Sequence, residues 1–197
     1  MLESAAGERK MFKSVKHALQ IAYLMEFVQM YAKSCLAHLI DKAMEKYGIE
    51  PEEESSVFWE RLDQSEIKAQ CAMIRNVCQR VLTPDEYTYV MAKYSQEPGE
   101  IDKDGLLTLD GKIPARNRFQ DSVEGGLLCV EKTNCVCQMI QHVLDYGTPS
   151  ERTIARENDE TLYKVRTDIG RIRRRAKGLE FDIERKLAPL FRKEGVV

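Results

Sequence analysis

The sequence predicts a mainly α-helical fold, with an N-terminal helical bundle followed by a C-terminal unit of three helices. Two observations carry this prediction. Apolar residues recur at spacings of three and four over most of the chain, which is the period of an amphipathic helix. Prolines next to carboxylates, and glycines further along, divide this pattern into segments of helix length.

The first helix is predicted from Lys10 to Tyr47, where Gly48 is a suitable C-terminal residue. Its apolar residues, such as Leu19 and Leu36, cover more than one stripe of the helix. So wide an apolar surface is typical of a central bundle helix or of a helix shared with a second subunit. We therefore expect that the N-terminal helices form a homodimer or bind a protein partner.

Further helices complete the expected bundle, residues 10–98. Pro51 and the acidic residues 52–54 are well placed at a helix start. A stripe at spacings of 4, 3, 4 and 3 predicts a helix with a buried face: Ile67, Cys71, Ile74, Cys78 and Val81. The segment Thr83-Pro84-Asp85-Glu86 is a capping-box start for the next helix, which ends near Pro98.

Residues 99–126 are the least helical part of the sequence because glycines punctuate them. Residues 106–109, between Asp104-Gly105 and Asp110-Gly111, predict a short strand or hairpin arm. We expect this region to be a linker or a small excursion between the two helical parts.

The C-terminal part, residues 127–197, reads as a series of helices. A helix is predicted over 127–146 and ends at Gly147. The segment Thr148-Pro149-Ser150-Glu151 repeats the capping pattern and opens a short helix to about Asn158. A longer helix follows over 160–177, and Gly178 is expected to separate it from a last helix.

The two helices around residue 159 predict a helix-turn-helix. Ala155 is small, so the short helix and the next one can cross closely, while Val165 and Ile169 turn one face inward. The opposite face is expected to bind DNA phosphates through seven basic residues, with Asp168 as the one acid among them. These residues are Lys164, Arg166, Arg171, Arg173, Arg174, Arg175 and Lys177. The residues expected to read bases, at the start of this helix, are Thr161, Tyr163, Lys164 and Thr167.

Residues 143–176 resemble region 4 of sigma-70-type factors and the related trihelical units of phage transcription regulators, including late-gene antiterminators. The likeness lies in Tyr146-Gly147, Ile154-Ala155, Val165, Ile169 and the arginine-rich run. It implies a sequence-specific, phage-derived transcription regulator that binds double-stranded DNA beside RNA polymerase. Asp159 stands where that family has a turn glycine, and Asn158 and Glu160 stand at its apolar positions.

The net charge, the apolar stretches and the cysteines indicate which kinds of partner and location to expect. The net charge is −2, so any attraction to DNA must be local. The most apolar stretch, residues 18–32, is too short and too polar to cross a bilayer, so we expect no membrane contact. Without a secretion signal, the six cysteines indicate a cytoplasmic protein with reduced thiols.

Two groups of metal-ligand types were weighed and not favoured. Cys129, Cys135, Cys137 and His142 lie close in sequence, but a continuous helix would splay Cys135 and Cys137 by about 200°, so buried thiols are favoured over zinc. Asp102, Asp104 and Asp110 surround a glycine at the wrong position for a calcium loop. We expect no metal and no cofactor.

No pattern for catalysis is present: the sequence has no phosphate-binding glycine loop, no nucleophile elbow and no H-E-x-x-H motif. An enzyme is therefore not expected. The competing class is an adaptor or inhibitor that binds another protein through the long N-terminal helix. Changing Arg171, Arg173 and Arg174 to glutamate would abolish binding by a DNA regulator, whereas binding to a non-acidic protein partner would survive.

Overall fold

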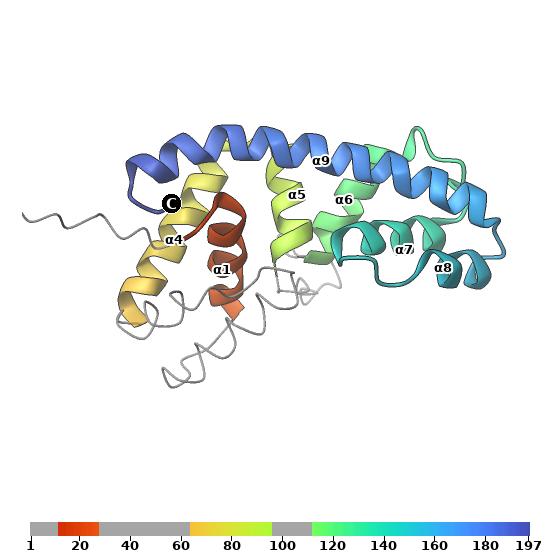
Figure 1. Cartoon of the computed structure of the whole chain (residues 1–197), viewed down its shortest axis with the longest axis horizontal. Helices are drawn as coiled ribbons and strands as arrows, with labels where there is room; N and C mark the ends of the chain where they lie inside the picture. Colours follow the sequence, from red (N-terminus) through yellow and green to blue (C-terminus); the bar gives the residue numbers. More distant parts are fainter. Residues whose placement is uncertain (1–11, 28–63, 96–111) are drawn as a thin grey trace, which may run out of the picture. The chain divides into compact units, whose positions relative to one another are not determined.

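The computed structural model of the protein describes residues 12–27, 64–95 and 112–197 (Figure 1). This part of the chain is helical and contains no strand, which confirms the mainly α-helical class. Its helices are α1 (Val15–Phe27), α4 (Gln64–Val81), α5 (Pro84–Tyr94), α6 (Lys112–Glu124), α7 (Thr133–Leu144), α8 (Glu151–Glu157) and α9 (Leu162–Lys193).

The chain divides into two compact units. Unit 1 comprises residues 1–81 and 184–197, and unit 2 comprises residues 82–183. This division differs from the expected domains of residues 10–98 and 127–197, because α5 belongs with the C-terminal helices in unit 2. The physical reason is that α5 buries its apolar face against α6.

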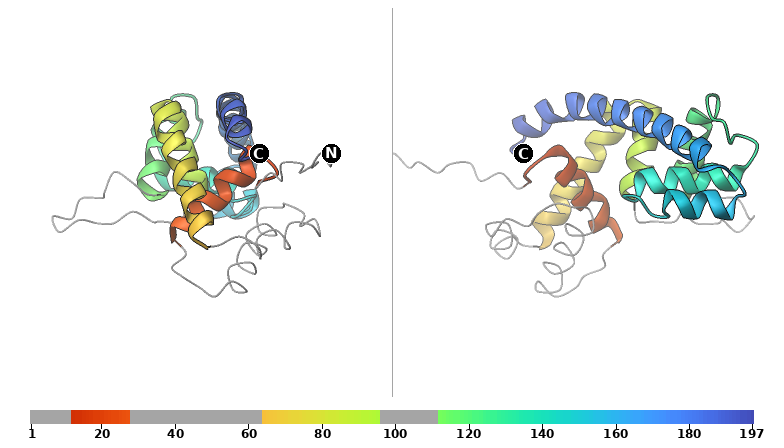
Figure 2. Two further views of the ribbon diagram at one scale, coloured as in Figure 1. Left: turned by 90° about the vertical axis from the view of Figure 1, so that its left-hand side faces the viewer. Right: turned by 45° about the vertical axis from the view of Figure 1, so that its right-hand side comes forward.

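In the described part of unit 1, α1 and α4 pack side by side (Figure 2). Leu19 and Tyr23 of α1 and Ile74 of α4 are among the buried apolar residues. The guanidinium of Arg75 on α4 donates a hydrogen bond to the carbonyl oxygen of Ala22 at 2.7 Å, which joins the two helices directly.

The buried stripe predicted for α4 and the capping box predicted for α5 are both present, apart from the last residue of the stripe. Four of the five stripe residues of α4 are buried, and Val81, the last of them, is 36% exposed. Thr83 caps α5: its hydroxyl accepts the N–H of Glu86 at 3.4 Å, and the Glu86 carboxylate accepts the N–H of Thr83 at 2.8 Å. The capping box is therefore confirmed.

Part of the expected linker is a helix. Residues 112–124 form α6, which packs against both α5 and α7. The glycines that predicted a linker lie outside this helix, and Pro114 lies in its first turn, where a missing N–H costs nothing. Phe119 supplies the buried contact, with its ring 5.5 Å from that of Tyr89 on α5.

The helix predicted over 127–146 is shorter than expected. Residues 127–132 form a loop, in which the N–H groups of Leu128 and Cys129 bind the carboxylate of Asp168, and α7 begins at Thr133. The helix after it, α8, is capped by Ser150 rather than by Thr148, since the Ser150 hydroxyl accepts the N–H of Thr153.

The predicted break at Gly178 is wrong, because α9 is continuous from Leu162 to Lys193. Leu179 and Ile183 carry the buried stripe of the helix past the glycine. Burying one such side chain stabilises by about 1.5–3 kcal/mol, which exceeds the roughly 1 kcal/mol cost of a glycine in a helix.

Several predictions fall outside the described residues. These are the later part of the long first helix (residues 28–47), the short helix after Pro51, the strand at 106–109 and the aspartates around Gly105.

Candidate nucleic-acid interface

The turn between α8 and α9 is well defined by hydrogen bonds. Asp159 has a φ of 49°, so it takes the left-handed conformation for which a glycine was expected. Aspartate is one of the few other residues that adopt this conformation readily. The Asn158 amide donates to the carbonyl of Ile154 at 2.9 Å and so closes the C-terminal end of α8, which explains a polar residue at this position.

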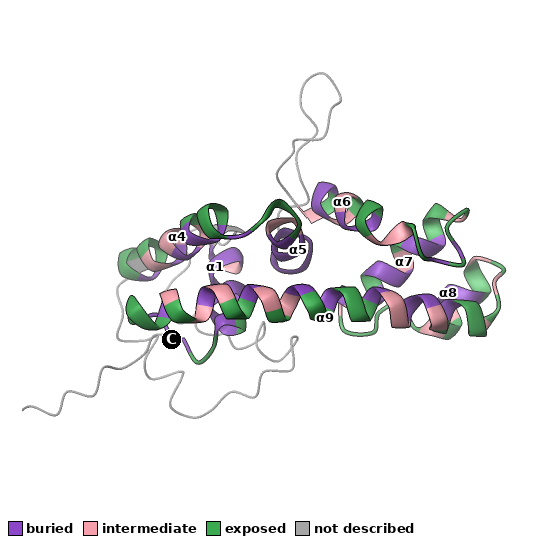
Figure 3. Cartoon of the chain, turned by 90° about the horizontal axis from the view of Figure 1, so that it is seen from above, coloured by how far each residue is buried: buried purple, intermediate pink, exposed green. Residues whose placement is uncertain are grey.

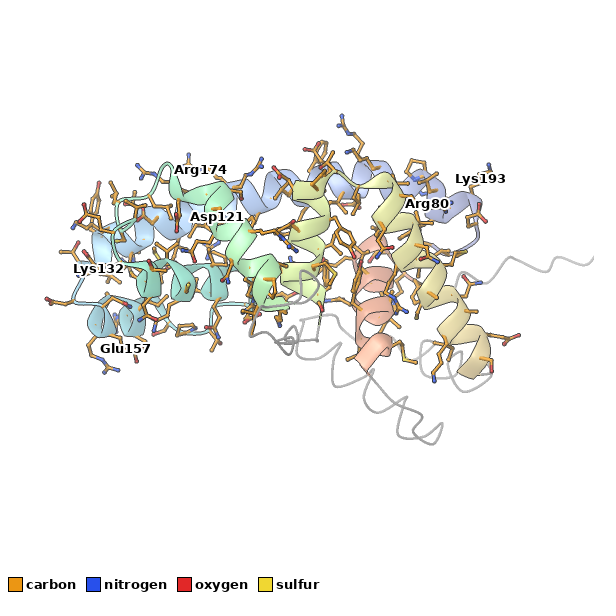
Figure 4. All side chains as sticks on the ribbon, turned by 180° about the vertical axis from the view of Figure 1, so that it is seen from behind. Arg80, Asp121, Lys132, Glu157, Arg174 and Lys193 are labelled. Carbon is orange, nitrogen blue, oxygen red and sulfur yellow. The ribbon has the colours of Figure 1, made fainter. Side chains whose placement is uncertain are left out.

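The ammonium group of Lys132, a residue in the loop before α7 (Figure 4), binds the backbone of this turn. Its ammonium donates to the carbonyls of Asn158 at 2.7 Å and Asp159 at 3.0 Å, and it forms an ion pair with Glu160 at 3.1 Å. Lys164 binds the other oxygen of Glu160 at 3.2 Å. The hydrogen bonds from these two lysines hold the pKa of the Glu160 carboxyl below its usual value.

Asp168 is the second tie between α9 and the loop before α7. Its side chain is fully buried, and its carboxylate accepts the N–H of Leu128 and of Cys129. Arg171 completes the arrangement: its guanidinium lies 3.3 Å from Asp168 and also donates to the carbonyl of Gly126. The predicted position of Asp168 among the basic residues of the DNA face is wrong. Its spacing of three from Val165 and four from Ile172 puts it on the buried stripe.

The outer face of α9 is the surface that was predicted to bind DNA. Figure 3 shows alternating buried and exposed residues along this helix. Val165, Ile169 and Ile172 are buried on one side. On the other side a stripe at spacings of three and four is exposed or half-buried: Tyr163, Thr167, Gly170, Arg174, Lys177 and Phe181.

The seven basic residues of the prediction fall into two groups. Four of them bind carboxylates within unit 2: Lys164 binds Glu160, Arg166 binds Glu151, Arg171 binds Asp168 and Arg175 binds Asp85. The other three, Arg173, Arg174 and Lys177, are exposed and have no carboxylate partner among the described residues. Arg174 only donates to the carbonyl of Gly170, one turn earlier in its own helix.

The four residues expected to read bases are also not equivalent. The Thr161 hydroxyl accepts the N–H of Lys164 at 3.4 Å, and the Thr167 hydroxyl donates to the carbonyl of Tyr163 at 2.9 Å. Lys164 has Glu160 as its partner. The side chain of Tyr163 is 74% exposed, and its hydroxyl has no hydrogen-bond partner in the part of the chain described.

Of the four residues considered as zinc ligands, Cys137 and His142 bind partners outside the group, whereas Cys129 and Cys135 contact each other. Cys129 and Cys135 are buried, and burial raises the pKa of both thiols, that of Cys129 to about 12. Cys137 is exposed and its sulfur lies 3.0 Å from the amide oxygen of Gln120, while His142 binds the carbonyl of Pro149 at 2.7 Å. Within residues 12–27, 64–95 and 112–197, no three His, Cys, Asp or Glu side chains are grouped as metal ligands would be.

Among the helices of the described residues, none combines the length and the apolar character needed to cross a membrane. Comparison of the sequence with models of known protein families and with characterised proteins found no match.

Proposed function

We propose that this protein binds double-stranded DNA through the outer face of α9 and acts as a sequence-specific transcription regulator. The observation that carries the proposal is the group Arg173, Arg174 and Lys177, exposed cations that no carboxylate of the described residues neutralises. Phosphate binding needs such a local positive surface, and the net charge of the whole chain, −2, does not provide one.

The dimensions of the face fit this partner. A helix rises about 1.5 Å per residue, so Arg174 lies roughly 16 Å along α9 from Tyr163. The major groove of B-DNA is about 12 Å wide. If the start of α9 enters the groove, Tyr163 faces base edges, and Arg174 and Lys177 reach the phosphates at the groove's edge.

Tyr163 is the residue to which we assign base reading. Its aromatic ring is exposed at the N-terminal end of α9, where recognition helices contact bases. Its hydroxyl can donate to a base acceptor or accept from a base amino group. The hydroxyls of Thr161 and Thr167 already serve the helix backbone, so they are weaker candidates than the sequence suggested.

The wider proposal is a phage-derived regulator that acts beside RNA polymerase, with a homodimer formed through the N-terminal helices. Its support is the resemblance of residues 143–176 and the wide apolar surface predicted for the first helix. A dimer would place two α9 helices on successive half-sites of the DNA.

The test measures binding of the purified full chain to random duplex DNA. Fluorescence anisotropy gives the affinity at each of several salt concentrations. We expect log affinity to fall linearly with log salt, by about 0.9 per phosphate contact. The variant Arg174→Glu/Lys177→Glu should bind about 10- to 100-fold more weakly at low salt, and its salt slope should be smaller by roughly 2. Arg171 is left unchanged because its side chain supports the fold.

The control is Lys68→Glu/Arg80→Glu on α4, which changes the net charge by the same amount at exposed positions of unit 1. This variant should keep most of the affinity. Equal losses in the two variants would show that only total charge matters and would count against an interface on α9. No binding by the unchanged protein at about 50 mM salt would overturn the proposal and favour an adaptor or inhibitor role.

A further inference from the structure

Gly170 lies in the middle of α9, and no contact within the described residues requires a glycine there. Apart from the neighbouring backbone of α9, a Cβ atom built at this position meets no atom of the described residues within 4 Å, so packing among them does not require a glycine. Its φ is that of an ordinary helix residue, so the backbone does not require one either. Glycine weakens a helix relative to alanine, since it has the most backbone freedom to lose on folding.

The position of Gly170 on α9 is specific. It belongs to the outer stripe, three residues after Thr167 and four before Arg174. It is therefore one turn from Arg174, whose guanidinium donates to its carbonyl at 3.4 Å. The glycine thus lies between Tyr163, at the proposed base-reading end of the face, and the cations without carboxylate partners.

We infer that Gly170 is the point at which the backbone of α9 comes closest to the DNA duplex. This inference rests on the proposed function and deepens it. A helix that lies in the major groove is held away from the DNA by its own side chains, and a glycine on the facing side removes the nearest of them. The closer approach brings Tyr163 to base edges and Arg174 to phosphates at the same time.

The chain provides a matched control in Gly178. This residue is also in α9 and in unit 2, it is exposed, and a Cβ atom there likewise meets nothing within 4 Å. It lies eight residues further along, about 12 Å by the rise of the helix, and so beyond the groove. Alanine at either position should stabilise the helix equally, raising Tm by about 2–4 °C.

The experiment compares Gly170→Ala, Gly178→Ala and the unchanged full chain by thermal unfolding and by anisotropy with random duplex DNA. We expect both variants to unfold at higher temperature. Gly170→Ala should bind at least tenfold more weakly, with an unchanged salt slope because no charge is altered. Gly178→Ala should bind like the unchanged protein.

The outcomes separate this inference from the proposed function. Salt-dependent binding that Gly170→Ala leaves intact would overturn the close approach at Gly170 and leave DNA binding by α9 standing. An equal loss in Gly178→Ala would also overturn it, because the effect would then belong to the helix as a whole. If the unchanged protein does not bind DNA, both the inference about Gly170 and the proposed function are overturned.

Discussion

The buried carboxylate of Asp168 accepts the backbone N–H of Leu128, at 2.9 Å to Oδ1 and 2.8 Å to Oδ2, across forty positions of sequence. Cys129 donates a further N–H to the same carboxylate at 2.9 Å. One side chain of α9 therefore fixes the loop before α7 against α9. The helix that carries the proposed interface is held in place by this contact.

Replacing Asp168 should destabilise the protein strongly. Asp168→Ala removes the acceptor of the buried N–H of Cys129 and of the partly buried N–H of Leu128, so we expect the free energy of unfolding to fall by about 3 kcal/mol. Asp168→Asn keeps one acceptor oxygen and should lose roughly half as much. Urea unfolding followed by circular dichroism measures both. The control, Asp121→Ala at an exposed position of α6, should change stability by less than about 0.5 kcal/mol, and an equal effect of Asp121 and Asp168 would contradict the assignment.

Lys93 of α5 is buried, and its ammonium lies 5.6 Å from the ring centres of Tyr89 and Tyr94 and 6.0 Å from that of Tyr146. It also forms an ion pair with Glu180 of α9. Burial, with a smaller effect of the Glu180 anion, raises the pKa of Tyr89 above its usual value. Lys93→Met keeps the stem and removes the charge, so we expect a loss of about 1–2 kcal/mol, because Glu180 can reach water.

Lys93→Ala also removes the packed stem and should lose about 3 kcal/mol in the same urea experiment. Equal losses for methionine and alanine would show that the charge alone matters. No loss in either variant would show that the ion pair and the aromatic contacts contribute nothing to stability.

His17 should make unit 1 sensitive to acid. Burial, with a smaller effect of Lys13, lowers the pKa of His17 to about 4, and its Nδ1 accepts the N–H of Lys13 at 3.2 Å. The unfolded chain binds this proton near pH 6.5, whereas the folded chain does not until about pH 4. The folded state therefore loses stability as pH falls through this window, by about 3 kcal/mol at most.

The measurement is the difference in free energy of unfolding between the unchanged protein and His17→Leu, taken from pH 4 to 8. The difference should grow in favour of the unchanged protein up to about pH 6.5 and then stay level. Other titrating groups cancel in this comparison. A difference that is flat across the whole range would mean that His17 keeps an ordinary pKa in the folded chain.

Cys137 should be the reactive thiol of the described residues. It is exposed, whereas Cys71, Cys78, Cys129 and Cys135 are buried. Desolvation raises the pKa of Cys137 as well as that of Cys71 and Cys78, the latter two to about 12, so accessibility to the reagent is what distinguishes Cys137. In a Cys35→Ser background, which removes the cysteine outside the described residues, an aromatic disulfide reagent should label one thiol quickly. Adding Cys137→Ser should abolish this fast reaction, and fast labelling that persists would show that a second thiol is accessible.

Substitutions of Tyr163 test whether this residue reads bases, separately from phosphate binding. Once a preferred DNA sequence has been selected, Tyr163→Ala should lose about 1–3 kcal/mol of discrimination between that sequence and random duplex. Tyr163→Phe should lose part of this if the hydroxyl makes the base contact. Binding to random DNA and its salt slope should change little, since no charge is altered. A uniform loss on both kinds of DNA would point instead to a packing role.

The sequence by itself determined the features that depend on neighbouring residues. The helical period of α4, the capping box at Thr83 and the short helix before Asp159 were all readable because helices form from contacts three and four residues apart. The exposed basic residues of α9 were readable for the same reason, because the buried stripe of Val165 and Ile169 leaves the other face outward.

Only the tertiary structure decided the features that depend on residues far apart. The spacing of Asp168 places it on the buried stripe of α9, but only the packing of the loop before α7 supplies the N–H groups of Leu128 and Cys129 that its carboxylate binds. Lys132 reaches Asn158 and Asp159 across the fold in the same way. The sequence also did not show which cations of α9 have a carboxylate partner. Arg175 pairs with Asp85 and Arg166 pairs with Glu151, and both carboxylates lie on other helices. Such pairings depend on how helices pack, which local propensity does not encode.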